Sequence, residues 1–214
     1  VLFVIIIMVM FASELILPVF MQGPMGITAA AAGLLLLPGS LLNGIMSPFM
    51  GSLFDKVGPK VMMIPATIIL AVTMFMFSNL TAETPQWVII VGFMLIMLSV
   101  SATMMPAETN GLNQLPKHLY THGTAVVSTL QPLAGAIGVS VFLGLLNSRQ
   151  QSYLEGAANP ESEAAISAAM VSGVEFVYFI IFIIALIAAV MSFFVYRAKP
   201  LEDLVPAPVK KDKN

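Results

Sequence analysis

Long runs of apolar residues divide the chain into six segments. The runs cover approximately residues 1–22, 29–52, 61–80, 86–106, 123–146 and 174–196, and each is about as long as a helix that crosses a ~30 Å hydrocarbon core. Apolar side chains occur all round each run, and Gly and Pro occur inside the runs, as in helices embedded in lipid. The pattern predicts an all-α membrane protein with six transmembrane helices.

Short polar segments containing Gly or Pro separate these runs. They include Gly23-Pro24, Gly58-Pro59, Thr84-Pro85, Leu115-Pro116 and the stretch 156–160. In the loop before the last run, Asn159, Pro160 and Glu161 match a helix cap, a first-turn proline and an acidic first turn. This predicts a short external helix that leads into the sixth span.

The two ends of the chain differ in character. Val1 already lies inside an apolar run, with no basic region before it that would indicate a signal peptide, so we expect the chain to be a piece of a longer protein. Residues 197–214 are rich in Pro and charge, which predicts a disordered tail.

The composition supports a membrane protein and excludes several other classes of protein and site. Of the residues, 58% are hydrophobic and only 9% are charged, and the mean hydropathy is +0.96. The absence of cysteine excludes a disulfide framework, a thiolate metal site and a cysteine nucleophile. The few basic residues lie in loops or in the tail, so no nucleic-acid partner is expected, and the partner to expect is the lipid bilayer.

The basic residues predict the orientation of the chain. Six spans place the second loop, the fourth loop and the tail on one side, and eight of the nine basic residues lie there: Lys56, Lys60, Lys117, Arg197, Lys199, Lys210, Lys211 and Lys213. Arg149 alone lies on the other side. Cytoplasmic loops carry such an excess of Lys and Arg, so we expect the tail and the segment 51–60 to be cytoplasmic.

The charged segment 51–60 has features of a tight connection between two helices. Gly51 allows close helix approach, and Gly58-Pro59 supplies a turn followed by a first-turn proline. Asp55 precedes the third span, where a carboxylate can meet the positive end of a helix or a basic side chain. The segment is expected to act as a clasp that favours one packing of the helices on either side.

The same segment resembles a loop signature of the major facilitator superfamily. The pattern Gly-x-Leu-x-Asp-basic-x-Gly-x-basic is matched by Gly51, Leu53, Asp55, Lys56, Gly58 and Lys60, whereas Pro59 stands where the family usually has a basic residue. The segment 105–116 (MPAETNGLNQLP), followed by 122–125 (HGTA), looks like the matching region of the fourteen-helix drug:proton antiporters of the lincomycin-resistance and multidrug efflux type.

This resemblance implies a place for the chain in a larger transporter. The six spans would be the C-terminal bundle, and an N-terminal half of the same transporter would be its partner. The resemblance also implies a bacterial plasma membrane location, proton coupling, and small cationic or amphiphilic drugs, lincosamides among them, as substrates.

Ionisable residues inside a span are candidates for function, because they are costly in lipid unless they face protein or water. Glu14 lies about 10 Å from the outer end of the first span, and a carboxylate held away from water can carry a proton. Glu108, at the cytoplasmic end of the fourth span, has Thr109 and Asn110 beside it. Both are candidate proton or substrate groups or, alternatively, interfacial and packing residues; Glu175 is expected to be an interfacial first-turn acid.

Polar and small residues also recur at helical spacing. In the fifth span they are Thr124, Ser128, Gln131, Gly135 and Gly138, and in the second span Ser40, Asn43 and Ser47. Asn43, Gln131 and Ser128 are candidates for lining a cavity. For the Gly and Ser positions, close helix packing is the preferred explanation. The sixteen methionines would suit a pocket for varied ligands, but the preferred explanation is that they fill the core or face lipid.

Other chemistry lacks its motifs. His118 and His122 are four residues apart, but no Glu lies between them as in a zinc-protease helix, so no metal site is expected. Neither a nucleotide-binding loop nor a nucleophile elbow occurs, so we expect no cofactor and no enzymatic activity. Two alternatives stay open beside drug export, namely a facilitator-superfamily carrier of a metabolite and a membrane scaffold that does not transport.

Overall fold

Five long α-helices make up a computed structural model of the protein, which describes residues 2–196. They are α1 (Leu2–Gln22), α2 (Ala29–Phe77), α3 (Gln86–Leu112), α4 (Tyr120–Glu155) and α5 (Glu163–Phe193), with a 3₁₀ turn η1 (Lys117–Leu119) before α4. Each α-helix is long and apolar enough to cross a membrane. The all-α membrane fold is confirmed, whereas the predicted tail at 197–214 lies outside the described residues.

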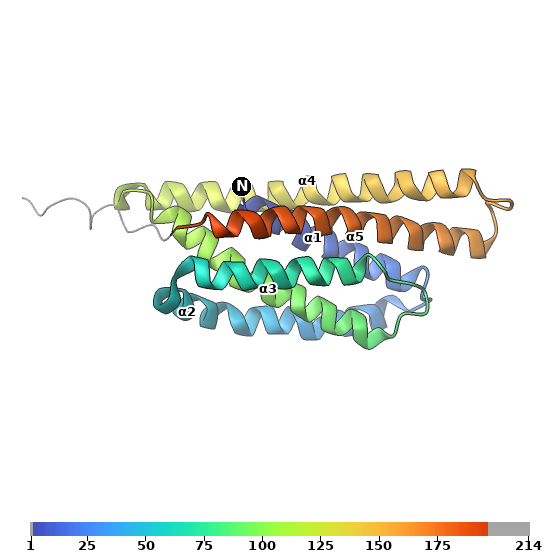
Figure 1. Ribbon diagram of the computed structural model, residues 1–214, viewed down its shortest axis with the longest axis horizontal. Helices are drawn as coiled ribbons and strands as arrows, with labels where there is room; N and C mark the ends of the chain where they lie inside the picture. Colours follow the sequence, from blue (N-terminus) through green and yellow to red (C-terminus); the bar gives the residue numbers. More distant parts are fainter. Residues whose placement is uncertain (1, 197–214) are drawn as a thin grey trace, which may run out of the picture.

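The six predicted spans appear as five helices, because α2 joins two of them. α2 covers the expected span 29–52 and residues 61–77 of the expected span 61–80, and its 49 residues would measure about 74 Å if straight, more than twice a ~30 Å hydrocarbon core. At Gly58 the backbone leaves the helical region, with φ 79° and ψ 171°. Figure 1 shows that α2 folds back there into two antiparallel arms. The expected loop at 51–60 is therefore helical on both sides of one kinked residue.

Gly58 and Pro59 explain how so short a reversal forms. Only glycine readily takes the positive φ found at residue 58, since it has no Cβ. Pro59 then restarts the helix without needing the hydrogen bond that its missing N–H cannot make. Both residues are buried, so the reversal is part of the packed structure.

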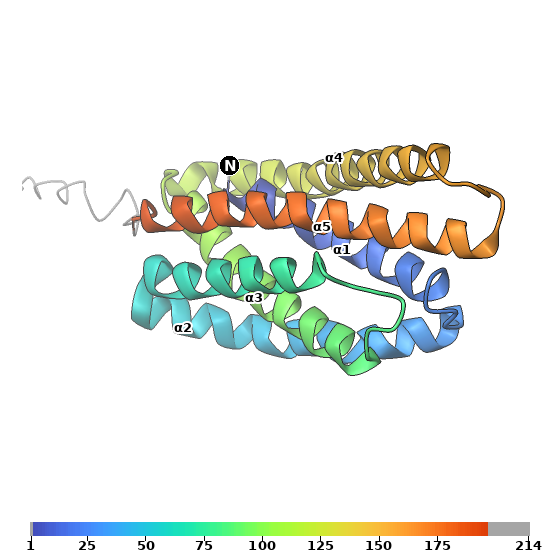
Figure 2. The ribbon, with the colours of Figure 1, turned by 45° about the vertical axis from the view of Figure 1, so that its right-hand side comes forward.

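The helices form two layers. In Figures 1 and 2, α5 and the second arm of α2 lie in front of α1 and α3, with the first arm of α2 and α4 at the two sides. Phe77 of α2 meets Tyr178 of α5 edge to face, with ring centroids 5.3 Å apart, and both side chains are fully buried. The core thus runs along the centre of the bundle and holds α1 and α3 by their inner faces.

The last loop differs from the prediction. α4 continues past residue 146 to Glu155, and α5 starts at Glu163 and runs without a break, so the expected short external helix is the first part of α5. The helix cap is Ser162 rather than Asn159, because the Ser162 hydroxyl accepts a hydrogen bond from Ala165 N at 3.2 Å. Both helices extend beyond the rest of the bundle (Figure 1).

Candidate functional site

Glu14 lies on the uncovered side of α1. Its neighbours Ser13, Ile16 and Leu17 are buried in the bundle, whereas Glu14 and Leu15 are exposed. The carboxylate sits 12 residues after the start of a 21-residue apolar helix, far from both helix ends. Within the part of the chain that the structure describes, an acidic side chain therefore lies on the outer face of α1. Membrane helices are normally apolar at such a distance from their ends.

Glu108 lies in a cavity between α1, α3 and the start of α4. The cavity measures about 550 Å³, and Phe3, Glu108, Gly111, Leu115 and His122 are among the residues that line it. Glu108 is half-buried. The turn from α3 through η1 into α4 brings His122 to the wall that holds Glu108.

In the sequence, His122 was considered as half of a metal site and as part of the segment 122–125 in the family resemblance, and its place beside Glu108 was missed. Among residues 2–196, no group of three or more His, Cys, Asp or Glu side chains is placed to hold a metal ion. The available signal was the spacing of Glu108 and His122 across a predicted helix turn, which does not by itself say that the two side chains share a cavity.

Asn43 connects two helices. Its amide Nδ2 lies 3.5 Å from Sδ of Met97, so the first arm of α2 meets α3 at this point. Sulfur is a weak hydrogen-bond acceptor, so most of the amide's hydrogen-bonding capacity is not used by this contact. Asn43 therefore takes part in packing and is not among the residues lining the Glu108 cavity.

The polar and small residues of α4 divide into two groups. Gly135 and Gly138 are buried against α1, at Phe11 and Met8 respectively. Ser128 is exposed, and Gln131 is half-buried between the two groups. The structure does not bring Ser128, Gln131, Asn43 and Glu14 into the cavity that holds Glu108.

The hairpin residues lie at the end of the bundle where α5 finishes. Asp55 and Lys56 are exposed beside the Gly58 kink. Lys60 places its Nζ 5.5 Å from the ring centroid of Tyr196, a cation–π contact between α2 and the residues after α5. Gly51 packs against α3, where an added Cβ would lie 3.2 Å from Met105 Cε.

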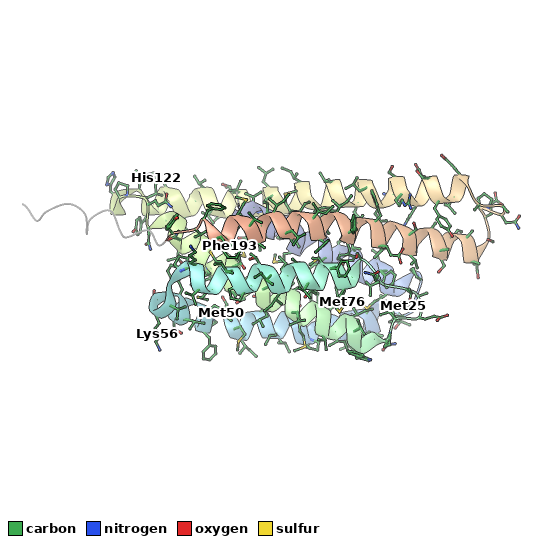
Figure 3. All side chains as sticks on the ribbon, in the orientation of Figure 1. Met25, Met50, Lys56, Met76, His122 and Phe193 are labelled. Carbon is green, nitrogen blue, oxygen red and sulfur yellow. The ribbon has the colours of Figure 1, made fainter. Side chains whose placement is uncertain are left out.

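A further contact closes the same end of the molecule. Asn110 Nδ2 of α3 donates a hydrogen bond of 2.9 Å to the backbone oxygen of Tyr196. Tyr196 therefore links α3 to Lys60 of the hairpin. Figure 3 shows Lys56 and His122 at this end too, on opposite sides of the bundle. No feature of the sequence indicated the contacts of Tyr196, because residues 60, 110 and 196 are far apart along the chain.

The all-α membrane fold agrees with comparisons to known proteins. The family model described as Major Facilitator Superfamily matches residues 1–139. The chain belongs to the major facilitator superfamily. This membership confirms the resemblance carried by Gly51, Leu53, Asp55, Lys56, Gly58 and Lys60.

Several members of this superfamily are similar over most of the chain. The lincomycin resistance protein LmrB of Bacillus subtilis is 43% identical over 192 residues, covering 90% of this chain and 40% of the relative. The LmrB protein of Listeria monocytogenes is 39% identical over 192 residues, with 90% and 41% covered. The multidrug export protein EmrB of Haemophilus influenzae is 28% identical over 131 residues, with 60% and 26% covered. The chain thus resembles transporters of the multidrug efflux type and spans about two fifths of the LmrB proteins.

Proposed function

We propose that the chain is the C-terminal half of a proton-coupled multidrug exporter. The observation that carries the proposal is the exposed Glu14 in the middle of an apolar helix. A carboxylate facing hydrocarbon would cost several kcal/mol, so this face of α1 needs protein or a water-filled cavity against it. A second bundle that packs over this face and encloses a central cavity would meet that need.

Glu14 and Glu108 are the groups proposed to bind protons or substrate. Protonation neutralises a carboxylate and removes the cost of burying its charge, so one side chain can exist in two environments during a transport cycle. Glu108 and His122 would line the entrance at the cytoplasmic end. We propose that Gln131 and Ser128, which follow on α4, line the central cavity. Asn43, at the contact of α2 with α3, is proposed to line it from the other side.

The hairpin is proposed to hold one conformation of the bundle. Gly58 sets the reversal, Gly51 packs the first arm against α3, and Leu53 lies exposed beside the kink. Asp55, Lys56 and Lys60 supply the charges. Through Tyr196 and Asn110, the hairpin is joined to the ends of α5 and α3. Such a link would pass movement of the hairpin to the helix that carries Glu108.

The names of the similar proteins guide the choice of substrates. We propose lincosamides and small cationic or amphiphilic drugs, exported across the bacterial plasma membrane in exchange for protons by alternating access. The two arms of α2 would give six membrane crossings, and from the distribution of basic residues we propose that the hairpin and the C-terminus face the cytoplasm. We propose that the chain is part of a carrier and not of an enzyme.

Efflux from cells tests this proposal. The whole transporter that contains this chain is expressed in a drug-sensitive bacterium, and the efflux of ethidium and lincomycin is measured with and without a protonophore. We expect the protonophore to stop efflux. Glu14→Gln is expected to lower proton-driven efflux at least tenfold while the amount of protein in the membrane stays the same.

Glu83→Gln is the matched control, because Glu83 is an exposed acid in the loop between α2 and α3. It should transport like the wild type. Equal activity of the Glu14 and Glu83 variants would remove Glu14 from the mechanism. An expressed protein that exports neither compound would instead favour a metabolite carrier or a scaffold, and a carrier would show competition by a single metabolite.

A further inference from the structure

An apolar cavity lies beside the Gly58 kink, away from the cavity that holds Glu108. It measures about 280 Å³ and lies between the two arms of α2 and α3, with Met50, Val57, Val61, Ile69 and Leu98 among its lining residues. Ser99 supplies the polar side chain of this wall. Sites for drug-sized molecules usually measure about 300 to 1,000 Å³ and carry several placed polar groups, so this cavity suits a narrower and more apolar ligand.

The mouth of the cavity is formed by exposed apolar side chains. Leu53 and Val57 on the first arm are exposed, as is Val61 on the second arm, at 62%. In the membrane placement proposed above, on which this inference rests, these residues lie just inside the cytoplasmic surface. The cavity then opens toward the hydrocarbon chains of the inner leaflet.

Basic side chains stand at the aqueous end of the mouth. Lys56 directly precedes Val57, and Lys60 directly precedes Val61; both lysines are exposed. Asp55 is the acidic residue at the same place, so these three residues carry one net positive charge. Figure 3 shows Lys56 at the end of the hairpin, with Met50 of the cavity further along the bundle. An apolar slot below a positive rim matches a lipid with a negative headgroup.

We infer that this cavity binds one acyl chain of an anionic phospholipid from the cytoplasmic leaflet, with the phosphate held by Lys56 and Lys60. The cytoplasmic leaflet is rich in anionic lipids, which attract basic residues near the membrane surface. The acyl chain would contact both arms of α2 and α3 at once and would cover the exposed side chains around the kink. The Lys60 ammonium lies over Tyr196, so Lys56 is the principal contact for the phosphate.

Photochemical labelling tests the position of the acyl chain. The whole transporter is placed in vesicles that contain a small fraction of phosphatidylglycerol with a photoreactive diazirine in its acyl chain, and labelled peptides are identified by mass spectrometry after illumination. We expect labels within residues 50–69 and 98–102. Val61→Phe, which places a larger side chain at the mouth, should reduce this labelling several-fold.

Val72→Phe is a matched control for this variant. Val72 is 63% exposed on the same arm of α2 and does not line the cavity. This substitution should leave the labelling unchanged. Equal labelling of the two variants would overturn the proposed position.

A second comparison tests the headgroup. Lys56→Gln should lower labelling by the phosphatidylglycerol probe about fivefold, the factor that corresponds to about 1 kcal/mol for one basic residue near an anionic surface. Labelling by a phosphatidylcholine probe with the same chains should be weaker and should not change in this variant. Arg149→Gln, at the other end of the bundle, should affect neither probe. Equal labelling by the two probes in the wild type would overturn the requirement for an anionic lipid.

The remaining outcomes identify a different occupant. Ser99 Oγ is buried and has no hydrogen-bond partner in the part of the chain that the structure describes. Displacement of the probe by a small drug, lost in Ser99→Ala, would assign the cavity to that drug and overturn the lipid. Absence of labelling in active transporter would also overturn the lipid, because protein would then cover the mouth of the cavity. The labelling experiment does not depend on transport activity. A protein that is labelled but does not transport would therefore contradict the proposed function and leave the lipid site intact.

Discussion

The start and the middle of α4 carry the same kind of sequence but have different surroundings. In the middle of the helix, Gly135 and Gly138 are buried against Phe11 and Met8 of α1. Near its start, Val126 and Val127 face Phe3 of α1 across a cavity of about 550 Å³, and Ser128 is exposed. One pattern of small and polar residues therefore supports close packing in the middle of the helix and an open space near its start.

The difference shows how a helix can be fixed and still border a cavity. Without a Cβ at Gly138, α4 approaches the backbone of α1, which provides van der Waals contact where the hydrophobic effect does not act between helices in lipid. Nearer the start of α4, the cavity that holds Glu108 and His122 lies between the two helices. The glycine contact would then be the fixed point, and the open end the part suited to ligand binding.

The largest effect is expected at Gly138. In Gly138→Ala, the added Cβ would lie 2.7 Å from Met8 Cα and 3.0 Å from Met8 O, so the helices must separate. We expect a loss of about 1 to 3 kcal/mol in the free energy of unfolding, typical of overpacking. Reversible denaturation of the purified whole transporter in detergent micelles measures it.

Gly144→Ala is the control for this prediction. A Cβ at Gly144 meets nothing within 4 Å, so only the gain in helix propensity, up to about 1 kcal/mol, should remain. If both alanine variants lose the same stability, the close approach at Gly138 is not what stabilises this pair of helices.

A smaller effect is expected at Gly135. A Cβ there would lie 2.9 Å from Cγ and Cδ2 of Phe11, a side chain that can turn, whereas the backbone of Met8 cannot. Gly135→Ala should therefore change stability by less than about 1 kcal/mol, because the strain offsets the gain in propensity. A double-mutant cycle with Phe11→Leu should give a coupling of at least about 0.5 kcal/mol. Additive effects would contradict the contact.

The smallest effect on stability is expected at Ser128. Because this side chain is exposed, Ser128→Ala should stay within about 0.5 kcal/mol of the wild type in the denaturation assay. Ser128→Trp should be similarly stable but should lower drug efflux several-fold by filling space beside the proposed cavity. Unchanged efflux in the tryptophan variant would place Ser128 on a surface that substrates do not reach.

Local features of the sequence predicted much of the fold. Apolar runs gave the membrane-crossing segments, and Gly58-Pro59 gave the reversal, because hydropathy and backbone freedom are properties of the residues themselves. The cap before α5 was assigned to Asn159 although Ser162 fulfils it. Both residue types cap helices well, so the local pattern did not discriminate between them.

The candidate site was less accessible to prediction. Glu14 and Glu108 were identified as ionisable residues within or beside apolar runs, but the cavity shared by Glu108 and His122 was not. Gly135 and Ser128 were expected on one polar face, yet one is buried and the other exposed. The path of α1 past α4 separates them.

The sequence by itself determined that this is a helical membrane protein, where its chain reverses, and which charges interrupt its apolar runs. Tertiary structure alone decided which polar groups are covered, that Tyr196 joins Asn110 to the hairpin, and where cavities lie. The physical reason is distance along the chain. Hydropathy and turn geometry act over a few residues, whereas contacts and cavities depend on how helices far apart in sequence pack together.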